Sequence, residues 1–327
     1  MDGATYNSKS TVCCGGVGRN LAEGVAKILG GATFISANGE FIKNILHPVC
    51  NTSIVTEKDV PTANCSVIFD KFGECKIITA DMGVHRCITP EMVLENVERI
   101  KDAPVVVFDA NLSVETIETI LEVAKDNDKP AFFEPTDMRV SEKPFVMPPQ
   151  LYTQIKFATP NLYELRNMAK FLGFKTASKK KSLDPAFIEE SEQSILTEVK
   201  QMASFMSNKV DNIIITLGSL GVVVARHNKV DSPFFNTSYK YIGKHDNFQM
   251  RYYPSVPMPG IINVSGAGDS FSSGLISAMV QGLPESICVS IGFEAANRAL
   301  MSKNAVAETY FNRKHKCWST KLSFREL

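Results

Sequence analysis

The sequence predicts an α/β protein built around a mainly parallel sheet. Short apolar runs rich in β-branched residues recur between segments of helical period, which is typical of parallel strands joined by crossover helices. One such run, residues 105–108, is apolar throughout, as a strand buried on both faces is. The chain of 327 residues, 44% hydrophobic and 21% charged, is long enough for one large α/β domain with a small appendage.

The first expected elements are a glycine-rich turn over residues 15–20 and a helix that ends at Gly30 and Gly31. This helix has Leu21, Val25 and Ile28 on one face. Residues 45–80 contain Val, Thr and turn residues with little helical period. They predict a small group of antiparallel strands outside the main sheet, which would form a minor domain or lid.

Strands and helices then alternate along the rest of the chain. Strands are expected at 105–108, 131–133, 155–158, 213–215 and 222–224. Helices are expected after Ser113, which can cap the first turn, and at 271–280 and 285–300. Residues 175–182, with four lysines, and residues 228–253 break the alternation, and we interpret both as solvated surface excursions.

The charge balance limits the classes of partner. Lys plus Arg number 35 and Asp plus Glu number 35, so the formal charge is zero and gives no electrostatic reason for binding nucleic acid or an anionic membrane surface. No apolar run is long enough to span a bilayer, and the first ten residues are too polar for a secretory signal. We therefore expect a cytoplasmic protein that acts on a small ligand.

The cysteines and histidines offer no recognisable metal or redox motif. The eight cysteines contain no C-x-x-C pair and the five histidines no H-E-x-x-H. We expect ordinary reduced thiols.

The most informative motif runs from Asn263 to Phe271 and leads directly into an apolar helix. Its small residues Gly266, Ala267 and Gly268 allow a tight turn in which consecutive amides at a helix start can point at one anion. A carboxylate, Asp269, follows at once. It would repel a phosphate, but it could accept the proton of a hydroxyl that attacks phosphorus. The alternative is a helix cap without chemistry.

A second motif, Gly-Gly-Val-Gly-Arg-Asn at residues 15–20, fails two familiar patterns. Leu21 stands where a dinucleotide fingerprint needs its third glycine, which disfavours a nicotinamide-dependent oxidoreductase, and a P-loop would need Gly-Lys-Ser/Thr. What remains is a glycine pair that allows close approach of a ligand, followed by Asn20, whose amide can both donate to and accept from sugar hydroxyls. A tight packing turn is the alternative.

Two further motifs are open to a structural explanation. Residues 216–221, Thr-Leu-Gly-Ser-Leu-Gly, link two expected strands and could be only a hairpin turn. Asn161 and Glu164 follow a strand and open a helix, so they fit a capping box. They could equally orient a hydrated magnesium ion, because Mg²⁺ retains most of its water ligands.

Taken together and in this order, the four motifs resemble the ribokinase-like (PfkB) family of ATP-dependent carbohydrate and nucleoside kinases. They are spread over residues 15–300, nearly the whole chain. The resemblance implies a three-layer α/β/α fold, with residues 1–327 forming one domain and residues 45–80 contributing most of a β lid. It also implies ATP and Mg²⁺ as cofactors and a small uncharged acceptor.

The resemblance assigns a role to each motif. The anion hole and the catalytic base would be Gly266, Ala267, Gly268 and Asp269. The sugar would be bound by Gly15, Gly16 and Asn20. Magnesium and the phosphates would be organised by Asn161 and by Glu164, the latter acting on the metal through water. The nucleotide would be lined by Thr216, Gly218 and Gly221, with Asn297 near the adenine.

Within the family, four stretches are most similar to the pseudouridine kinases: 15–20, 80–82, 108–112 and 133–137. The expected reaction is therefore phosphorylation of a nucleoside 5′-hydroxyl, with pseudouridine as the first candidate. A kinase for ribose or adenosine and a catalytically silent ligand-binding relative are the alternatives. Candidate substrate contacts are the acidic residues that follow expected strands, Asp81, Asp109 and Glu134.

Two departures from the family pattern bear on these expectations. Asn263-Val264 stands where the family usually has Asp-Thr, which leaves a requirement for a monovalent cation open. Residues 1–14 contain no apolar strand, so we expect the family's first core strand to be missing, as in a truncated chain or a piece of a longer protein. Such a loss would weaken stability and sugar binding. A homodimer formed through the lid is compatible with the family.

Overall fold

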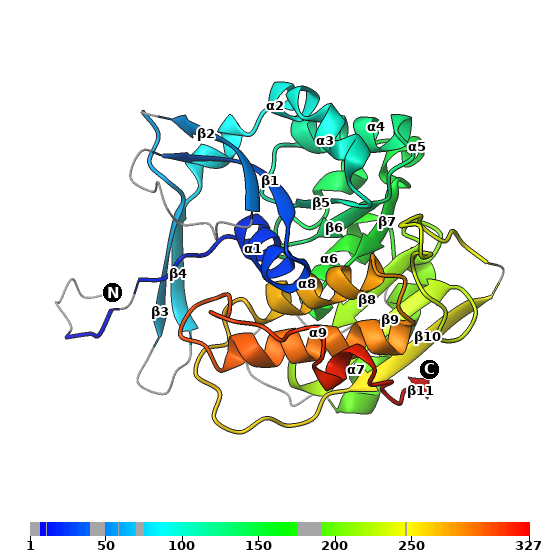
Figure 1. Cartoon of the computed structure of the whole chain (residues 1–327). Helices are drawn as coiled ribbons and strands as arrows, with labels where there is room; N and C mark the ends of the chain where they lie inside the picture. The colour runs from blue at the N-terminus through cyan, green and yellow to red at the C-terminus, as the bar shows by residue number, and fades with distance from the viewer. Residues whose placement is uncertain are drawn as a thin grey trace.

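A computed structural model describes residues 7–10, 12–39, 50–57, 59–69, 75–175, 191–245 and 247–327 (Figure 1). Its strands are β1 (Ala32–Gly39), β2 (Cys50–Glu57), β3 (Asn64–Phe69), β4 (Cys75–Asp81), β5 (Val106–Asp109), β6 (Ala131–Glu134), β7 (Ile155–Ala158), β8 (Asn212–Thr216), β9 (Gly221–His227), β10 (Phe248–Pro254) and β11 (Arg325–Glu326). Its α-helices are α1 (Val17–Leu29), α2 (Pro90–Glu95), α3 (Val97–Asp102), α4 (Val114–Asp126), α5 (Pro149–Tyr152), α6 (Leu162–Phe171), α7 (Glu192–Met206), α8 (Ala267–Met279) and α9 (Glu285–Leu300). Short 3₁₀ helices are η1 (Gly83–Cys87), η2 (Lys143–Val146), η3 (Gly218–Leu220) and η4 (Lys316–Trp318).

The main sheet has seven strands in the order β11-β10-β9-β8-β7-β6-β5. Strands β5 to β8 pair in parallel, and β9, β10 and β11 continue the sheet with antiparallel pairings. Because β10 is antiparallel to β9, it runs in the same direction as β5 to β8. The predicted α/β class with a mainly parallel sheet is confirmed.

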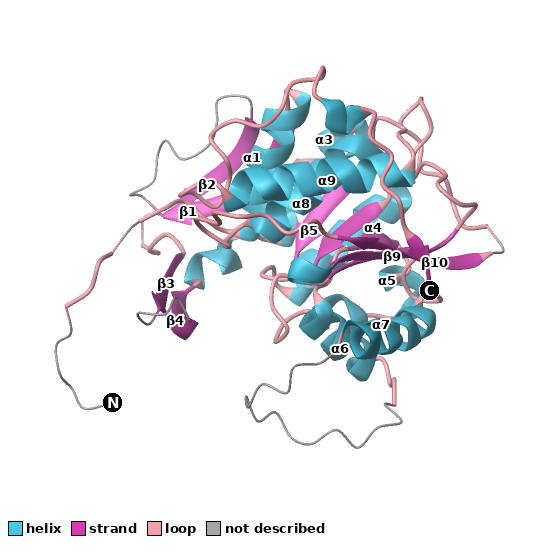
Figure 2. Ribbon diagram, turned by 90° about the horizontal axis from the view of Figure 1, so that it is seen from below, coloured by secondary structure: helices cyan, strands magenta, loops and turns pink. Residues whose placement is uncertain are grey.

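Helices cover both faces of this sheet and make three layers. Figure 2 shows α1, α8 and α9 on one side and α6 and α7 on the other. Successive strand residues point to opposite faces, so Phe132 packs in the core with α1, α8 and α9, whereas Phe133 packs in the core with α4, α6 and α7. Strand β8 divides in the same way, with Ile214 facing one core and Ile213 and Ile215 the other.

Local capping sets the start of two helices as the sequence predicts. The Ser113 side chain accepts a hydrogen bond from the backbone N–H of Thr116 at the start of α4. Asn161 caps α6, and the Glu164 side chain closes the box by accepting from the Asn161 backbone N–H. Both devices satisfy amides that have no partner within the helix.

Helices α8 and α9 lie side by side in front of the sheet (Figure 1). A side chain at Gly274 would come within 2.7 Å of the Ile291 carbonyl oxygen, and one at Gly292 within 2.7 Å of the Phe271 ring. The two helices therefore pack closely because each has a glycine at the contact.

Two small sheets lie outside the main sheet. Strands β3 and β4 pair antiparallel, as predicted for residues 45–80, and they stand apart from the helical layers in Figure 2. Strand β2 differs from the prediction, because it pairs in parallel with β1 across a long connection. Residues 45–49, 58 and 70–74 of this predicted lid lie outside the described residues.

The prediction that residues 228–253 form a surface excursion is wrong for much of the segment. Phe234 and Phe235 are fully buried, and β10 is a strand of the main sheet. The polar residue Arg251 in β10 is also fully buried, because Glu285 of α9 binds its guanidinium group at 2.5 and 2.6 Å. Of the other predicted excursion, residues 176–182 lie outside the described residues.

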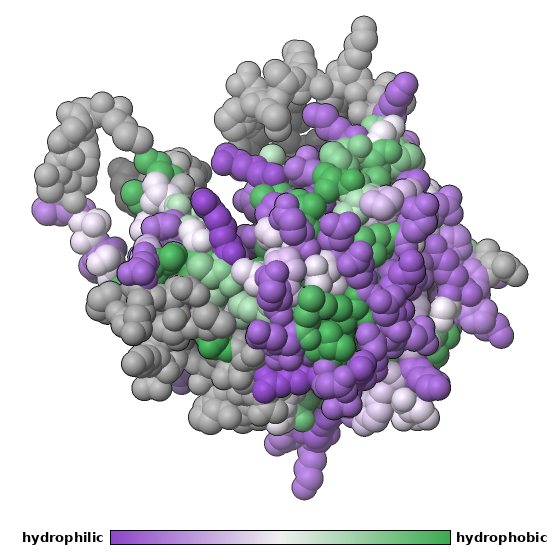
Figure 3. Space-filling model, turned by 90° about the horizontal axis from the view of Figure 1, so that it is seen from above, coloured by the Kyte–Doolittle hydropathy of each residue, from purple (hydrophilic) through white to green (hydrophobic). Residues whose placement is uncertain are grey.

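The surface has the mixed character expected from the composition. The face drawn in Figure 3 is mainly hydrophilic, with separate hydrophobic patches. Within the described segments, no helix is both long and apolar enough to cross a membrane. The cysteines described as free thiols are Cys13, Cys14, Cys65, Cys87, Cys288 and Cys317.

Candidate active site

The predicted site residues gather at the carboxyl edge of the parallel strands. Asp109 ends β5, Glu134 ends β6, and Thr216 ends β8, while Asn161 follows β7 and forms a parallel bridge with Thr216. Carboxyl ends of parallel strands meet at one edge of a sheet, which is where open α/β proteins bind ligands. Helix α8 begins at the same edge, since Ser272 in its first turns donates a hydrogen bond to Glu134.

The turn before α8 can be made only by glycine. Gly266 has φ +78°, and a Cβ atom there would lie 2.1 Å from the backbone oxygen of Ala305. No side chain caps the helix at Gly266, and the first turn contains Asp269. The N–H groups of Gly266, Ala267 and Gly268 thus stand at or before the start of α8, where an anion is favoured.

Asn20 and Asp269 are brought together from opposite ends of the sequence. The Asn20 Nδ2 group donates a hydrogen bond of 2.7 Å to Asp269 Oδ2. Helices α1 and α8 pack so closely that a Cβ atom at Gly24 would lie 2.4 Å from Ser273 Oγ. The carboxylate of Asp269 is therefore oriented by an amide and does not serve as the helix cap that the alternative interpretation required.

Asp109 joins the start of α1 to the end of β5. Its Oδ2 atom accepts from the Gly18 N–H at 3.1 Å, and its Oδ1 atom accepts from the Asn111 N–H at 2.8 Å. Lys143 supports the following loop, since its Nζ donates to the carbonyl oxygens of Ala110 and Leu112 at 2.8 and 2.9 Å. The sequence did not point to Lys143, which lies more than 30 residues from this loop.

Glu134 is buried and hydrogen-bonded to two hydroxyl groups. Only 8% of the residue is exposed. Its Oε2 atom accepts from Thr159 Oγ1 at 2.5 Å and from Ser272 Oγ at 3.0 Å. Neither hydroxyl was identified from the sequence, because nothing in their local pattern distinguishes them from ordinary core serines and threonines.

Asn161 and Glu164 form the predicted capping box. The Asn161 Oδ1 atom accepts from the N–H groups of Tyr163 and Glu164, and Glu164 Oε2 accepts from the Asn161 N–H at 2.8 Å. Glu164 is only 4% exposed. The box therefore holds one carboxylate oxygen in place beside the end of β8.

The turn from Thr216 to Gly221 connects β8 and β9 as the predicted hairpin. Gly218 has φ +59° and Gly221 has φ +120°, and a Cβ atom at Gly221 would lie 2.2 Å from the Tyr253 carbonyl oxygen. Packing alone therefore requires a glycine at position 221.

Asn297 lies in the last turn of α9. The Leu300 carbonyl at the end of this helix accepts from the N–H groups of residues 262 and 263, just ahead of the Gly266 turn.

Gly15 and Gly16 lie exposed immediately before α1. Gly16 has φ +94°, and the space around Gly15 is open. The glycine pair is therefore not explained by tight packing, and it leaves the backbone open to a ligand.

Burial and mutual repulsion raise the pKa values of the acidic groups at this edge. Burial, with a smaller effect of Asp109, raises the pKa of Asp269 to about 6, although the Asn20 hydrogen bond opposes the rise. Burial is also the main cause that raises the pKa of Glu164 to about 7, with repulsion from Asp137 and Asp269 adding to it. Asp109 has its pKa raised by burial as well.

Asp81 does not lie at this edge. It ends β4, in the two-stranded sheet with β3, and its Oδ1 atom accepts from the Gly83 N–H at 3.2 Å. It stands at the end of a strand, as expected, but that strand belongs to a small sheet and not to the main sheet, so Asp81 is not grouped with Asp109 and Glu134. Its role as a substrate contact stays a prediction.

The described side chains are compatible with a metal ion that has few direct protein ligands. No group of three or more His, Cys, Asp or Glu side chains among them could hold an ion directly. The buried carboxylate of Glu164 is compatible with Mg²⁺, which takes few protein ligands and retains water and phosphate oxygens.

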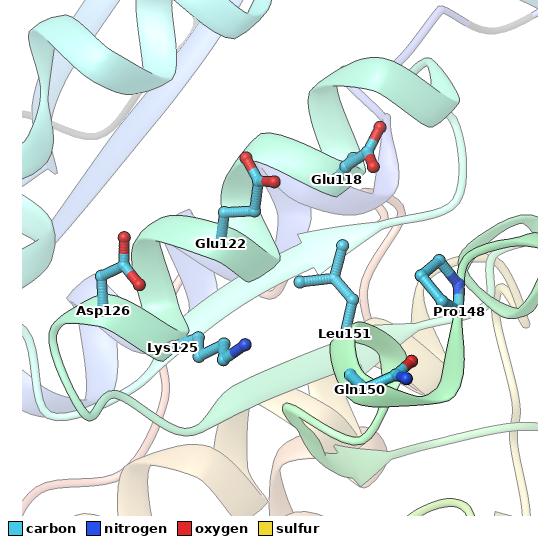
Figure 4. A pocket seen from close by; sticks show the side chains of 7 residues that line it. All are labelled: Glu118, Glu122, Lys125, Asp126, Pro148, Gln150 and Leu151. Atoms are coloured by element: carbon cyan, nitrogen blue, oxygen red, sulfur yellow. The ribbon is translucent and has the colours of Figure 1, made fainter.

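A groove of about 620 Å³ lies elsewhere on the molecule (Figure 4). It is lined by Glu118, Glu122 and Asp126 of α4 and by Leu151 of α5. None of the predicted site residues lines it.

Comparisons with known proteins agree with this arrangement. The model of the pfkB family of carbohydrate kinases matches residues 4–309. A pseudouridine kinase of Arabidopsis thaliana is 24% identical over 341 residues, covering 94% of this chain and 86% of that protein. A pseudouridine kinase of Escherichia coli K12 is 27% identical over 278 residues, covering 83% of this chain and 74% of that protein.

Solved structures share the fold at low sequence identity. A carbohydrate kinase from Agrobacterium tumefaciens has a TM-score of 0.70 at 17% identity and covers 100% of this chain and 93% of its own. Arabidopsis thaliana ribokinase complexed with ribose and ATP has a TM-score of 0.67 at 18% identity, covering 94% of this chain and 89% of its own. The three-layer ribokinase-like fold is thereby confirmed.

Proposed function

The chain belongs to the pfkB family of carbohydrate kinases, and we propose that it phosphorylates the 5′-hydroxyl of a nucleoside, with pseudouridine as the first candidate. Family membership makes it an ATP-dependent sugar or nucleoside kinase. The choice of acceptor is supported by the two relatives named pseudouridine kinases, both of which align with most of this chain.

One observation carries the proposal for the site. Asn20 and Asp269, which are 249 residues apart in the sequence, form a hydrogen bond of 2.7 Å. This contact puts a side chain suited to sugar hydroxyls next to a carboxylate at the start of a helix whose amides favour an anion. An acceptor hydroxyl bound there would lie between its base and the phosphate that it attacks.

Asp269 acts as the general base in this proposal. As the acceptor oxygen forms its bond to the γ-phosphorus, its proton passes to the Asp269 carboxylate and the bond from phosphorus to the bridging oxygen of ADP breaks. A pKa of about 6 keeps most Asp269 side chains ionised at neutral pH while leaving them basic enough to take the proton. The amides of Gly266, Ala267 and Gly268 stabilise the charge on the transferring group.

The nucleotide and the sugar are assigned to the flanking motifs. Asn161 and Glu164 would hold Mg²⁺, with Glu164 acting through water, and the ion would neutralise phosphate charge. The glycines that would approach the sugar are Gly15 and Gly16, and the residues that would line the nucleotide are Thr216, Gly218, Gly221 and Asn297.

We also propose that residues 1–327 form one kinase domain in which β3 and β4 serve as a lid. Val67 and Ile68 of β3 expose apolar side chains, 42% and 54% exposed, which suits contact with a ligand or a second copy of the chain. A homodimer through this sheet and a cytoplasmic location are part of the same proposal. Sedimentation analysis tests the dimer.

The proposed function is tested by an ATP-consumption assay with pseudouridine, uridine, adenosine and ribose. We expect pseudouridine to give the highest kcat/KM and a phosphorylated product. A preference for ribose or adenosine would refute pseudouridine as the acceptor and leave the proposed kinase activity standing. If nucleotide raises the melting temperature but no acceptor yields product, the chain is a ligand-binding relative and the proposal fails.

A further inference from the structure

We propose that Glu134 is a positioning residue that holds the two halves of the kinase site at a fixed separation. One half is the start of α8, which carries Asp269, and the other is the segment after β7, which carries Asn161 and Glu164. The inference rests on the proposed function, since it concerns the same site. It replaces the sequence-based expectation that Glu134 contacts the substrate.

The hydrogen bonds of Glu134 define this role. Its Oε2 atom accepts from Thr159 Oγ1 at 2.5 Å and from Ser272 Oγ at 3.0 Å. Thr159 lies two residues before Asn161, and Ser272 lies three residues after Asp269 on α8. A single carboxyl oxygen therefore connects both functional segments to the end of β6.

The three side chains that form this connection are buried. Glu134 is 8% exposed, Thr159 3% and Ser272 1%. Hydroxyl groups in so buried a place need a fixed partner, because an unpaired polar group is costly there. The interaction is thus a permanent part of the fold beneath the site.

The backbone that follows Glu134 is strained and is held by hydrogen bonds. Thr136 has φ +68°, a left-handed conformation that a β-branched residue rarely adopts. Its Oγ1 atom accepts from the Ala110 N–H and donates to the Glu134 carbonyl, both at 3.3 Å. Strain of this kind persists where the surrounding structure fixes it, and it is common at functional sites.

The charge of Glu134 fits the same role. Burial first, and then repulsion from Asp269 of α8 and Glu164 of α6, raise the pKa of Glu134 well above its usual range. This rise favours the protonated form of Glu134, which would add no negative charge beneath the phosphates. Glutamine has the same shape, and its amide oxygen can accept the same two hydrogen bonds, so it should replace Glu134 with little loss.

Two variants of Glu134 separate positioning from stability. We expect Glu134→Ala to lower kcat by about 10²-fold while the KM values change by less than about threefold, because misplaced groups slow the chemical step more than they weaken binding. We expect Glu134→Gln to restore kcat to within about threefold of wild type. Both are measured at a temperature where circular dichroism shows each variant to be folded.

The pH profile tests which form of Glu134 the folded site holds. If Glu134 is protonated, Glu134→Gln removes no charge, and the acid limb of kcat/KM, which Asp269 sets, stays at its wild-type position. If Glu134 were ionised, the same substitution would lower the pKa of Asp269 and move the limb to lower pH.

A matched pair of hydroxyl deletions completes the test. Thr159→Val removes one of the two donors to Glu134. Thr116→Val removes a hydroxyl that is equally buried in α4 and donates to the Ile88 carbonyl at 2.8 Å, away from the site. We expect both to lower the melting temperature, and only Thr159→Val to lower kcat, by about tenfold.

The inference is overturned if folded Glu134→Ala keeps kcat within threefold of wild type, if Glu134→Gln loses as much as Glu134→Ala, or if Thr159→Val and Thr116→Val have the same kcat. Wild-type turnover distinguishes this failure from failure of the proposed function. An inactive wild type refutes the kinase proposal, whereas an active wild type with unaffected Glu134 variants refutes only the inference.

Discussion

Replacing Asn20 with alanine should change the pH dependence of catalysis in a direction that the structure fixes. The pKa of Asp269, about 6, is raised chiefly by burial and lowered by the Asn20 hydrogen bond. Removing the donor leaves burial unopposed, so the pKa should rise. Because the base must be deprotonated, activity is lost as the pH falls through this pKa, and the acid limb should move to higher pH.

The size of the shift follows from the strength of the contact. A hydrogen bond to a charged group contributes about 1.5–3 kcal/mol, and one pKa unit corresponds to about 1.4 kcal/mol. Asp269 is partly exposed, so water replaces some of the lost interaction. We expect the limb to move by about one unit, to roughly pH 7.

The assay is kcat/KM for the acceptor between about pH 5 and pH 9 at saturating ATP, since this ratio reports the ionisation of the free site. Asn127→Ala is the matched control, because the Asn127 amide donates at 2.8 Å to the Val123 carbonyl at the end of α4, away from the site. If Asn20→Ala and wild type share one acid limb, the hydrogen bond does not tune the base and the reasoning is refuted.

Three further predictions concern stability. Gly266→Ala should lower the free energy of unfolding, measured with a denaturant, by about 3 kcal/mol, because φ is +78° and a backbone oxygen would lie 2.1 Å from the new Cβ atom. Gly268→Ala is the control, because nothing lies within 4 Å of its new Cβ atom, and it should be no less stable than wild type. Arg251→Met should lower the free energy of unfolding by about 1.5–3 kcal/mol, because it removes charge-assisted hydrogen bonds to Glu285, which keeps its contacts with Arg226 and Tyr253. A loss below about 0.5 kcal/mol would contradict this account. Because folding raises the pKa of Asp269 to about 6, its ionisation should lower wild-type stability between about pH 4 and about pH 6. Asp269→Asn should lack this contribution and keep those of Glu164 and Asp109, and it should gain at most about 3 kcal/mol relative to wild type between these pH values.

Features set by neighbours in the sequence were predictable. The Ser113 cap and the Asn161–Glu164 box each need only residues within one helical turn, and both form as expected. The apolar runs at 105–108 and 131–133 form strands β5 and β6 within one residue of the expected bounds. Strand β6 is buried along its whole length, but β5 is an edge strand of the described sheet and Val107 is 37% exposed, so the expected burial on both faces is wrong for β5.

Features set by distant partners were not predictable. Residues 228–253 were expected to form a surface excursion, and only the structure shows that β10 joins the main sheet and that Glu285 from α9 binds its buried Arg251 side chain. The position of Glu134 after a strand predicted a substrate contact, and only the structure shows that Thr159 and Ser272 donate to one of its carboxyl oxygens. In both cases a polar residue is buried because a second polar residue, far along the chain, satisfies it.

The role of Asp269 is tested most directly by the turnover of Asp269→Asn with ATP and pseudouridine. The substitution keeps the shape of the side chain and removes its ability to accept a proton. The account predicts that kcat falls at least about 10²-fold, as loss of a general base does, while calorimetry shows ATP binding unchanged. The control is Asp126→Asn, an exposed residue at the end of α4, which should keep full activity. A kcat of Asp269→Asn within about twofold of wild type would contradict the account.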